Sequence, residues 1–497
     1  MTRWTRYWFA EGGRLGAAIV RIAIALAVLG ALWRLSGTPS SGDLPGEHTL
    51  YRPVGVWMLL GHTPPPDALV DALWAIALAG TVAMLAGIAS RASCAVSFVA
   101  ALALASLSYA SSRSWSHQYN VVFLAQAAFL GARSGDVLSI DALIRRVRGL
   151  PARDVPRGYQ WSLRLVQLAV ALMFAGAAVY KLAHGHFTLR WALSDNLRHQ
   201  LLVKYDLAGL PRPPLVDWLI DDPWRYRTAA VLNLISQAAP LAACFLVKRP
   251  VLRALCGAFF VIETIALGLV VDLWNPWWLP LYAVFVDWDA LLRRPPPAGD
   301  APPPRAARWY VIAFVVYDAV IVFVPGLAQV ANTYPFTNFP MFSSIRAREP
   351  YSEHQPYAVA TGHFEVFANA PAPPYVQEWF DHTNRTTIAA RAPDELHRRL
   401  AAIVAQAQHR WPDFGIRGVR LWLTIYEAPA VPAPAHFVAH PLAIVAELQG
   451  GVFRCELGRA PPVRSYAGDR VEPVAAGDDW TYGVADVDGQ PWLVERR

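Results

Sequence analysis

The sequence predicts an all-α polytopic membrane helix bundle of about nine spans, followed by a small α+β extramembrane domain. Three observations predict it. The 497 residues are 55% hydrophobic and only 16% charged, whereas a soluble chain carries about a quarter charged residues. Nine apolar runs follow one another in the first two thirds of the chain, and residues 331 onward lose such runs. This excludes a disordered, collagenous or purely cytosolic chain.

A helix needs about 20 apolar residues to cross the hydrocarbon core. The runs that approach this length are Leu15–Leu35, Leu69–Ala89, Ala92–Ala110, Tyr119–Gly131, Leu163–Lys181, Thr228–Val247, Leu252–Val271, Trp274–Leu292 and Trp309–Leu327. The fourth is short and the eighth contains Pro276 and Pro280. Either of these two could instead be a re-entrant or protein-buried segment.

Basic residues indicate the orientation, because Lys and Arg collect in cytoplasmic loops. With the N-terminus inside, the inside segments hold seventeen basic residues and the outside loops up to Arg225 hold seven. This predicts a multi-pass protein of the plasma (inner) membrane, with the N-terminus inside and the C-terminal domain outside. We expect the first span to be an uncleaved anchor rather than a signal peptide. The net charge of +7 therefore reflects topology, and we expect no nucleic-acid partner.

The predicted domains are a transmembrane bundle over 1–292, a Pro-rich inside linker over 293–308, a last transmembrane helix over 309–330 and an extracytoplasmic α+β domain over 331–497. Within the last domain, Tyr357–Phe367 and Val419–Tyr426 have the composition of strands. Asp394–Gln408 is predicted to be helical, with Leu396, Leu400, Ile403 and Val404 on one face.

Ionisable groups inside spans are costly and indicate functional sites by default. For Glu263 and Asp318 we weigh two interpretations, a protonated or hydrogen-bonded group that fastens helices together and a proton pathway. We expect Arg21 and Arg164 to snorkel or to pair.

Lys181 ends the fifth apolar run and His117 opens the fourth, and the topology places both at the outer leaflet. Lys181 either snorkels to the outer headgroups or is a desolvated amine, a fraction of which is neutral and can act as a base. His117 is a structural histidine or the partner of that base. His184 and His186 lack a nearby cluster of cysteines or carboxylates, so we expect no metal site. The four cysteines form neither a disulfide framework nor a CxxC motif.

Three short motifs follow in a fixed order between about residue 10 and residue 292. They are Trp115, His117, Tyr119 and Leu124 followed by Ser139-Ile140-Asp141; Ala175-Gly176 and Tyr180-Lys181-Leu182 followed by Trp191; and Asn275-Pro276-Trp277 followed by Asp287-Trp288. Their order and spacing resemble the vitamin K-dependent gamma-carboxylase superfamily, whose bacterial members are also called HTTM proteins.

The resemblance implies a role for each matching residue. Lys181 would be the base that deprotonates reduced vitamin K or menaquinone, and His117 would assist that step. Trp115, Tyr119 and Tyr180 are candidate cofactor-binding residues near the same site. O2 would then convert the quinol into an epoxide-forming strong base, and CO2 would add to a substrate glutamate. A dry membrane site suits this chemistry because water would quench such a base.

The chain departs from the family in three respects. The outer domain is far smaller, the lumenal disulfide cannot form, and Tyr180 replaces the first lysine of the family's Lys-Lys pair, with two extra residues between Gly176 and Lys181. These departures favour retained quinol chemistry over glutamate carboxylation.

Three functions therefore stay open. The first is a quinol-dependent oxygenase (epoxidase) or carboxylase-like enzyme of the outer leaflet. The second is a non-catalytic membrane protein that matures, exports or anchors a secreted peptide or protein partner. The third is a transporter, which the intramembrane Glu263 and Asp318 suggest but no internal repeat supports.

Overall fold

A computed structural model describes residues 2–36, 53–61, 63–112, 117–153, 155, 157–206, 211–293, 305–327, 358–369, 376, 380, 393–427, 438–457, 471–477, 480–487 and 490–496. The chain divides into two compact units. The first comprises Met1–Gly42, Leu50–Thr188 and Val231–Ser343, and the second Asp43–Thr49, Leu189–Ala230 and Ser344–Arg497. The second unit therefore includes a segment from the middle of the chain in addition to the predicted C-terminal domain. Most of the predicted linker, residues 294–304, lies outside the described residues.

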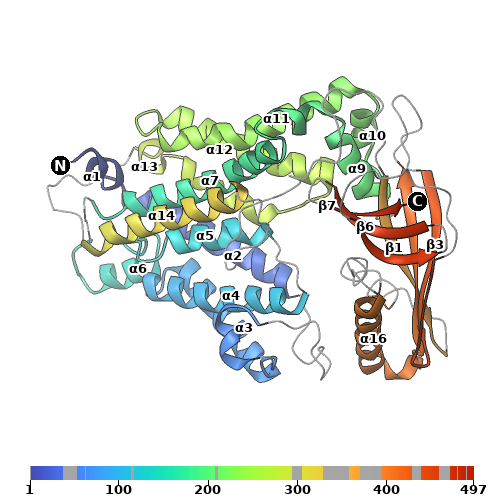
Figure 1. The fold of residues 1–497 in the computed structure, drawn as a ribbon. Coiled ribbons are helices and arrows are strands. Elements are labelled where there is room, and N and C mark those ends of the chain that lie inside the picture. Colours follow the sequence, from blue (N-terminus) through green and yellow to red (C-terminus); the bar gives the residue numbers. More distant parts are fainter. Residues whose placement is uncertain are drawn as a thin grey trace. The chain divides into compact units, whose positions relative to one another are not determined.

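The first two thirds of the chain are helical (Figure 1). The helices are α1 Arg3–Trp8, α2 Arg14–Leu35, η2 Gly55–Leu60, α3 Asp67–Ala86, α4 Ser90–Ser112, η3 His117–Tyr119, α5 Asn120–Ala128, α6 Ile140–Val147, α7 Gln160–His184, α8 Arg190–Leu193, α9 Asn196–Asp206, α10 Pro214–Ile220, α11 Pro223–Ala238, η4 Ala239–Cys244, α12 Pro250–Val271, η5 Pro276–Phe285, α13 Trp288–Leu291 and α14 Arg305–Leu327.

Six of these helices, all in the first unit, are long and apolar enough to cross a membrane. They are α2, α3, α4, α7, α12 and α14. The three remaining predicted spans are helical but shorter: α5 has 9 residues, α11 has 16 and continues into η4, and η5 is a 3₁₀ helix of 10. The chain is therefore a helical protein with six membrane-length apolar helices, and the count of nine stays a prediction.

The short fourth segment is buried in protein. All nine residues of α5 are buried, and the Gln126 side chain donates a hydrogen bond of 3.0 Å to Ser97 Oγ of α4. A polar side chain at this depth needs such a partner, because no water is available to it. The α5 part of this segment is thus surrounded by protein rather than by lipid, and its role as a crossing stays a prediction.

The eighth segment forms a 3₁₀ helix rather than an α-helix, with Pro276 at its first position. Proline lacks the amide hydrogen and clashes with the preceding turn, and Pro280 lies inside η5. The segment nevertheless runs along α2 in the opposite direction, with Trp277 beside Gly30 and Asp289 beside Gly16. Because a 3₁₀ helix rises about 2.0 Å per residue, ten residues cover about 20 Å, close to the length of α2 between those two glycines.

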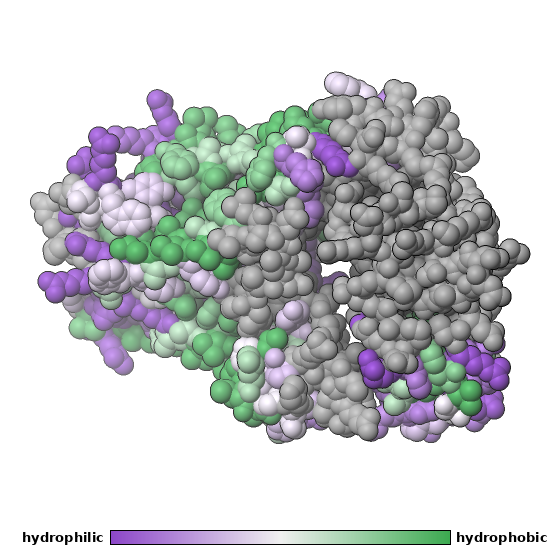
Figure 2. Space-filling view, in the orientation of Figure 1, coloured by the Kyte–Doolittle hydropathy of each residue, from purple (hydrophilic) through white to green (hydrophobic). Residues whose placement is uncertain are grey.

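The surface of the bundle is apolar along its flanks and hydrophilic at one end (Figure 2). Exposed apolar side chains lie on α3 and α12, including Leu78, Val82, Phe259 and Ile262. The hydrophilic end, at which α1, α6 and α13 lie in Figure 1, carries many arginines. We call it the basic end; its arginines include Arg3, Arg6, Arg14, Arg145, Arg146, Arg148 and Arg293. This surface is typical of a membrane-embedded bundle.

The predicted elements of the C-terminal domain are confirmed. Its strands are β1 Ala358–Phe367, β2 Gly418–Glu427, β3 Val438–Gln449 and β4 Val452–Leu457 in one antiparallel sheet, and β5 Val471–Gly477, β6 Trp480–Val487 and β7 Gln490–Arg496 in a second. The 3₁₀ helix η6, Pro412–Phe414, precedes β2. The helix α16, Pro393–Arg410, packs on the first sheet through the predicted face. Leu396, Leu400, Ile403 and Val404 are all buried there, against Phe364 and Leu421 among others.

Candidate functional site

Lys181 lies in the last turn of α7 and does not reach the surface. Its side chain is buried, with 2% exposed. Its Nζ donates hydrogen bonds to Asn233 Oδ1 at 2.5 Å and to Gln237 Oε1 at 2.9 Å, both on α11. A snorkelling lysine keeps its ammonium group in water, so the snorkelling interpretation of Lys181 is wrong.

Glu263 of α12 lies on the other side of the same two amides. Its carboxylate accepts hydrogen bonds from Asn233 Nδ2 at 2.6 Å, from Ser236 Oγ at 2.6 Å and from Gln237 Nε2 at 2.9 Å. Each amide therefore accepts from the amine and donates to the carboxylate. We call these five side chains, from α7, α11 and α12, the Lys181–Glu263 network.

The sequence of α11 explains why its polar groups converge. Asn233, Ser236 and Gln237 are spaced i, i+3 and i+4, which places them on one face of a helix. None of the three is among the site residues predicted from the sequence, because all of them lie within the apolar run Thr228–Val247. Their helical spacing was the available signal, since three polar residues on one face of an apolar segment indicate an internal contact.

The other intramembrane charges have different surroundings. Glu263 fastens α11 to α12, as one of its two interpretations proposed. Asp318 of α14 is fully buried, and neither of its oxygens has a hydrogen-bond partner among the residues that the structure describes. Arg21 of α2 is fully buried and donates to the backbone oxygens of Ser134, at 2.5 Å, and of Leu138. Arg21 is therefore bound by backbone carbonyl groups rather than snorkelling.

Lysine is rare in this chain. Of the 44 basic residues, three are lysines, Lys181, Lys204 and Lys248, and the rest are arginines. Arginine stays charged in proteins, whereas a lysine amine can lose its proton in a dry site. Among the described residues, Lys181 is the one buried amine of the bundle. It lies within hydrogen-bond reach of two amide oxygens, and the same two amides are bonded to the carboxylate of Glu263. Such an arrangement can take up a proton and stabilise the resulting charge.

The remaining predicted site residues lie on neighbouring elements. Tyr180 is buried, and its ring contacts that of His184 at 4.8 Å between centroids. Tyr119 is buried beside Phe123. The backbone of His117 lies in η3, but its side chain, like all of Trp115, lies outside the described residues. The roles of these residues stay predictions.

Trp278 connects the segment of His117 to the helix of Lys181. Its Nε1 donates to the backbone oxygen of Gln118 at 2.8 Å, and its ring contacts Phe174 at 5.7 Å. Phe174 precedes Lys181 by two helical turns, so both are on the same face of α7. Phe260 and Tyr282 complete an aromatic cluster around Phe174.

The histidine pair shows no metal-site geometry. His184 Nδ1 lies 2.9 Å from the backbone oxygen of Tyr180, and His186 is exposed. No group of three or more His, Cys, Asp or Glu side chains that could hold a metal ion is found within the described part of the chain.

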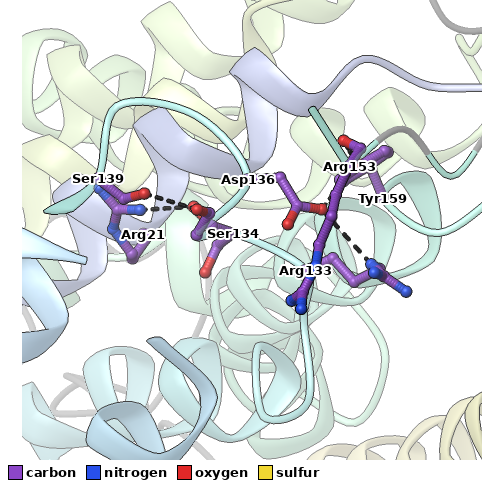
Figure 3. A network of polar contacts seen from close by, with 8 residues as sticks. Arg21, Arg133, Ser134, Asp136, Ser139, Arg153 and Tyr159 are labelled. Carbon is purple, nitrogen blue, oxygen red and sulfur yellow. Dashed lines mark hydrogen bonds and ion pairs between the residues drawn. The ribbon is translucent and has the colours of Figure 1, made fainter. Parts of the chain in front are cut away.

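A second polar network lies at the basic end (Figure 3). Asp136 accepts a hydrogen bond of 2.8 Å from the Tyr159 hydroxyl and forms an ion pair with Arg133, whose Nε lies 3.5 Å from the carboxylate. Burial, and then the contact with Asp136, raises the pKa of Tyr159 above its ordinary value, so the hydroxyl remains a donor at neutral pH. Together with the contact between Arg21 and Ser134, this network fixes the loop between α5 and α6.

Comparison with known proteins identifies no relative. No protein-family model matches the chain, and neither a curated protein nor a solved structure matches it.

Proposed function

We propose that the chain is a multi-pass protein of the plasma (inner) membrane with nine crossings, its N-terminus inside and its C-terminal domain outside. Contacts at the two ends of the bundle support the inclusion of the η5 segment among these crossings. At the basic end, Asp289 accepts a hydrogen bond from the Gly16 amide. At the opposite end, Trp278 binds the backbone oxygen of Gln118. The η5 segment between Trp278 and Asp289 thus links contacts at the two ends of the bundle, which supports its assignment as a crossing.

A cysteine-labelling experiment tests the topology. A single cysteine added after residue 497, in a variant without the four native cysteines, should react with a membrane-impermeant reagent applied from outside. A cysteine replacing Arg148 should be protected. Labelling of the second cysteine but not of the first would refute the proposed orientation.

We infer that the bundle carries an amine base that acts on a lipid-soluble quinol at the outer leaflet, with Lys181 as the base. The buried Lys181–Glu263 network supports this inference, because its amine combines a dry environment with acceptors for an ammonium group. The motifs that resemble the gamma-carboxylase superfamily name the substrate class, reduced vitamin K or menaquinone. The aromatic cluster of Phe174, Phe260 and Trp278 suits an aromatic ring.

The amine, the two amides and the carboxylate of the network each have a part in this proposal. Lys181 takes the proton of a quinol hydroxyl, and the resulting ammonium keeps its hydrogen bonds to Asn233 and Gln237. Glu263 balances the positive charge, so the buried site remains close to neutral. In the overall reaction the quinol and O2 yield the quinone epoxide and water. His117 would assist the base from η3.

An epoxidation assay tests the proposal. Purified protein in lipid nanodiscs is given reduced menaquinone and O2, and the epoxide is measured by mass spectrometry. We expect product from the wild type and a loss of about 10²- to 10⁴-fold with Lys181→Ala, the usual contribution of a general base. Lys248→Ala is the matched control, because it removes another of the chain's few lysines at a distance from the network. Equal product from wild type and Lys181→Ala, or none from wild type, would refute the proposal.

A further inference from the structure

A cavity of about 520 Å³ opens at the basic end of the bundle. Its walls come from the segment between α1 and α2, the first turns of α7, the start of α12 and the end of η5 with α13. All of these belong to the first unit. Lys181 is seventeen residues further along α7 than Arg164 in this wall, about 26 Å away at 1.5 Å per residue, so the cavity is separate from the Lys181–Glu263 network.

Arg164 lines this cavity without a counter-charge. Its side chain is 3% exposed, and its Nη1 is buried with no hydrogen-bond partner. Within the described part of the chain, no carboxylate lies within ion-pair distance of its guanidinium group. Its Cζ lies 4.4 Å from the centroid of the Tyr7 ring in α1.

Tyr7 is itself held in place. Its hydroxyl donates a hydrogen bond of 2.7 Å to the backbone oxygen of Cys244. Burial raises the pKa of Tyr7 to about 12, so the hydroxyl stays protonated and cannot serve as an anion for Arg164. The ring therefore positions the guanidinium group without neutralising it.

None of the three acidic groups in the wall forms an ion pair with Arg164. Asp287 forms an ion pair of 3.2 Å with Arg253, the second buried arginine of the cavity. Asp289 accepts a hydrogen bond of 3.1 Å from the Gly16 amide at the start of α2. Glu11 is exposed. Arg164 thus has no carboxylate partner among the described residues of the wall, and a buried charge without a partner is costly unless an anion binds beside it.

We propose that this cavity binds the phosphate group of an anionic ligand, with Arg164 as the principal contact and Arg253 beside it. A guanidinium group presents two parallel donors that match the oxygens of a phosphate. Apolar residues, including Leu163, Val284 and Val286, line the same cavity, which suits a headgroup that continues into acyl chains. Basic pockets between helices on the cytoplasmic side of a membrane commonly bind such headgroups.

Ligand-dependent thermal stabilisation tests the proposal. Delipidated full-length protein in neutral detergent receives phosphatidylglycerol, net-neutral phosphatidylcholine or inorganic phosphate, and the unfolding midpoint is recorded. We expect phosphatidylglycerol to raise the midpoint by several degrees. A comparable shift with inorganic phosphate would show that the phosphate group alone suffices, whereas a shift with phosphatidylglycerol only would identify the lipid as the source. A shift with neither anion would overturn the proposal.

Two variants assign the effect to the cavity. Arg164→Met removes the buried charge and keeps the length of the side chain, so it should fold without ligand and bind phosphatidylglycerol at least tenfold more weakly. Arg91→Gln is the matched control, because Arg91 is exposed and lines a smaller cavity of about 310 Å³ at the same end. Equal loss of binding in both variants, or retained binding in Arg164→Met, would refute the assignment to Arg164.

Discussion

The energetic coupling between Lys181 and Glu263 gives a sharp test of the buried network. We consider Lys181→Met, which removes the amine, Glu263→Gln, which removes the carboxylate charge, and the double variant. Lys181 binds Asn233 and Gln237, and both of these amides also bind Glu263. The two charges therefore share partners, although they make no direct contact.

The expected magnitude follows from the burial of both groups, which are 2% and 4% exposed. Removing one partner of a buried pair leaves the other charge uncompensated, at a cost of about 3–5 kcal/mol. Glu263 keeps three donors after the loss of Lys181, so we expect the lower limit, about 3 kcal/mol, for each single variant. The double variant removes both charges, and we expect it to lose about 1–2 kcal/mol rather than the sum of the two.

Unfolding of the purified protein by SDS in mixed micelles measures these free energies. Thr264→Val is the matched control for the cycle, because Thr264 adjoins Glu263 but bonds to the Tyr282 hydroxyl at 2.6 Å. Its combination with Lys181→Met should be additive within about 0.5 kcal/mol. A double variant of Lys181 and Glu263 that is equally additive would show that the two groups carry no opposite charges in the folded bundle, and would refute the reasoning.

Three further predictions concern other parts of the molecule. Asp318→Leu should stabilise the bundle by about 1–3 kcal/mol in the same SDS assay, because neither carboxyl oxygen has a partner and a buried unsatisfied polar group costs that much; destabilisation would contradict it. Gly13→Ala should destabilise by about 1–3 kcal/mol, since its Cβ would come within 1.8 Å of Asp289 Cγ, and Asp289→Ala should restore the stability if this clash is the cause. Leu400→Ala, in the core of α16 and the first sheet, should cost about 2–5 kcal/mol. Calorimetry should show this loss in the transition of the second unit and not in that of the first.

Three elements of the C-terminal domain, β1, β2 and α16, could be predicted because their patterns are local. Leu396, Leu400 and Ile403 recur at helical spacing, and the composition of 419–426 is that of a strand. The membrane-length helices followed equally from runs of apolar residues.

The burial of Asp195 could not be predicted in this way. Asp195 lies in a polar segment assigned to an outside loop, yet it is buried and accepts hydrogen bonds from Tyr226 at 2.6 Å and Arg227 at 2.9 Å.

The candidate site was predictable only in part, because its residues are brought together by packing between helices rather than by a local pattern. The type of residue and its place in an apolar run singled out Lys181 and Glu263 separately. Their connection depends on α11, which approaches both α7 and α12, and such a packing arrangement leaves no trace in the order of residues along the chain. Asn233 and Gln237 were visible as polar residues at helical spacing, but their partners could not be read from α11 alone.

Arg21 and Arg164 show that the position of an arginine in an apolar helix does not determine whether the protein supplies partners for its charge. Both are arginines near the start of an apolar helix at the basic end, and the sequence supports the same expectation for each. The loop after α5 turns its backbone oxygens of Ser134 and Leu138 toward Arg21, so that charge is satisfied by the protein. The surroundings of Arg164 offer the ring of Tyr7 and a second guanidinium group, that of Arg253, in one cavity. Because one of these two buried arginines is satisfied by the protein and the other is not, the difference indicates a ligand site at Arg164 rather than a general property of arginines at the basic end.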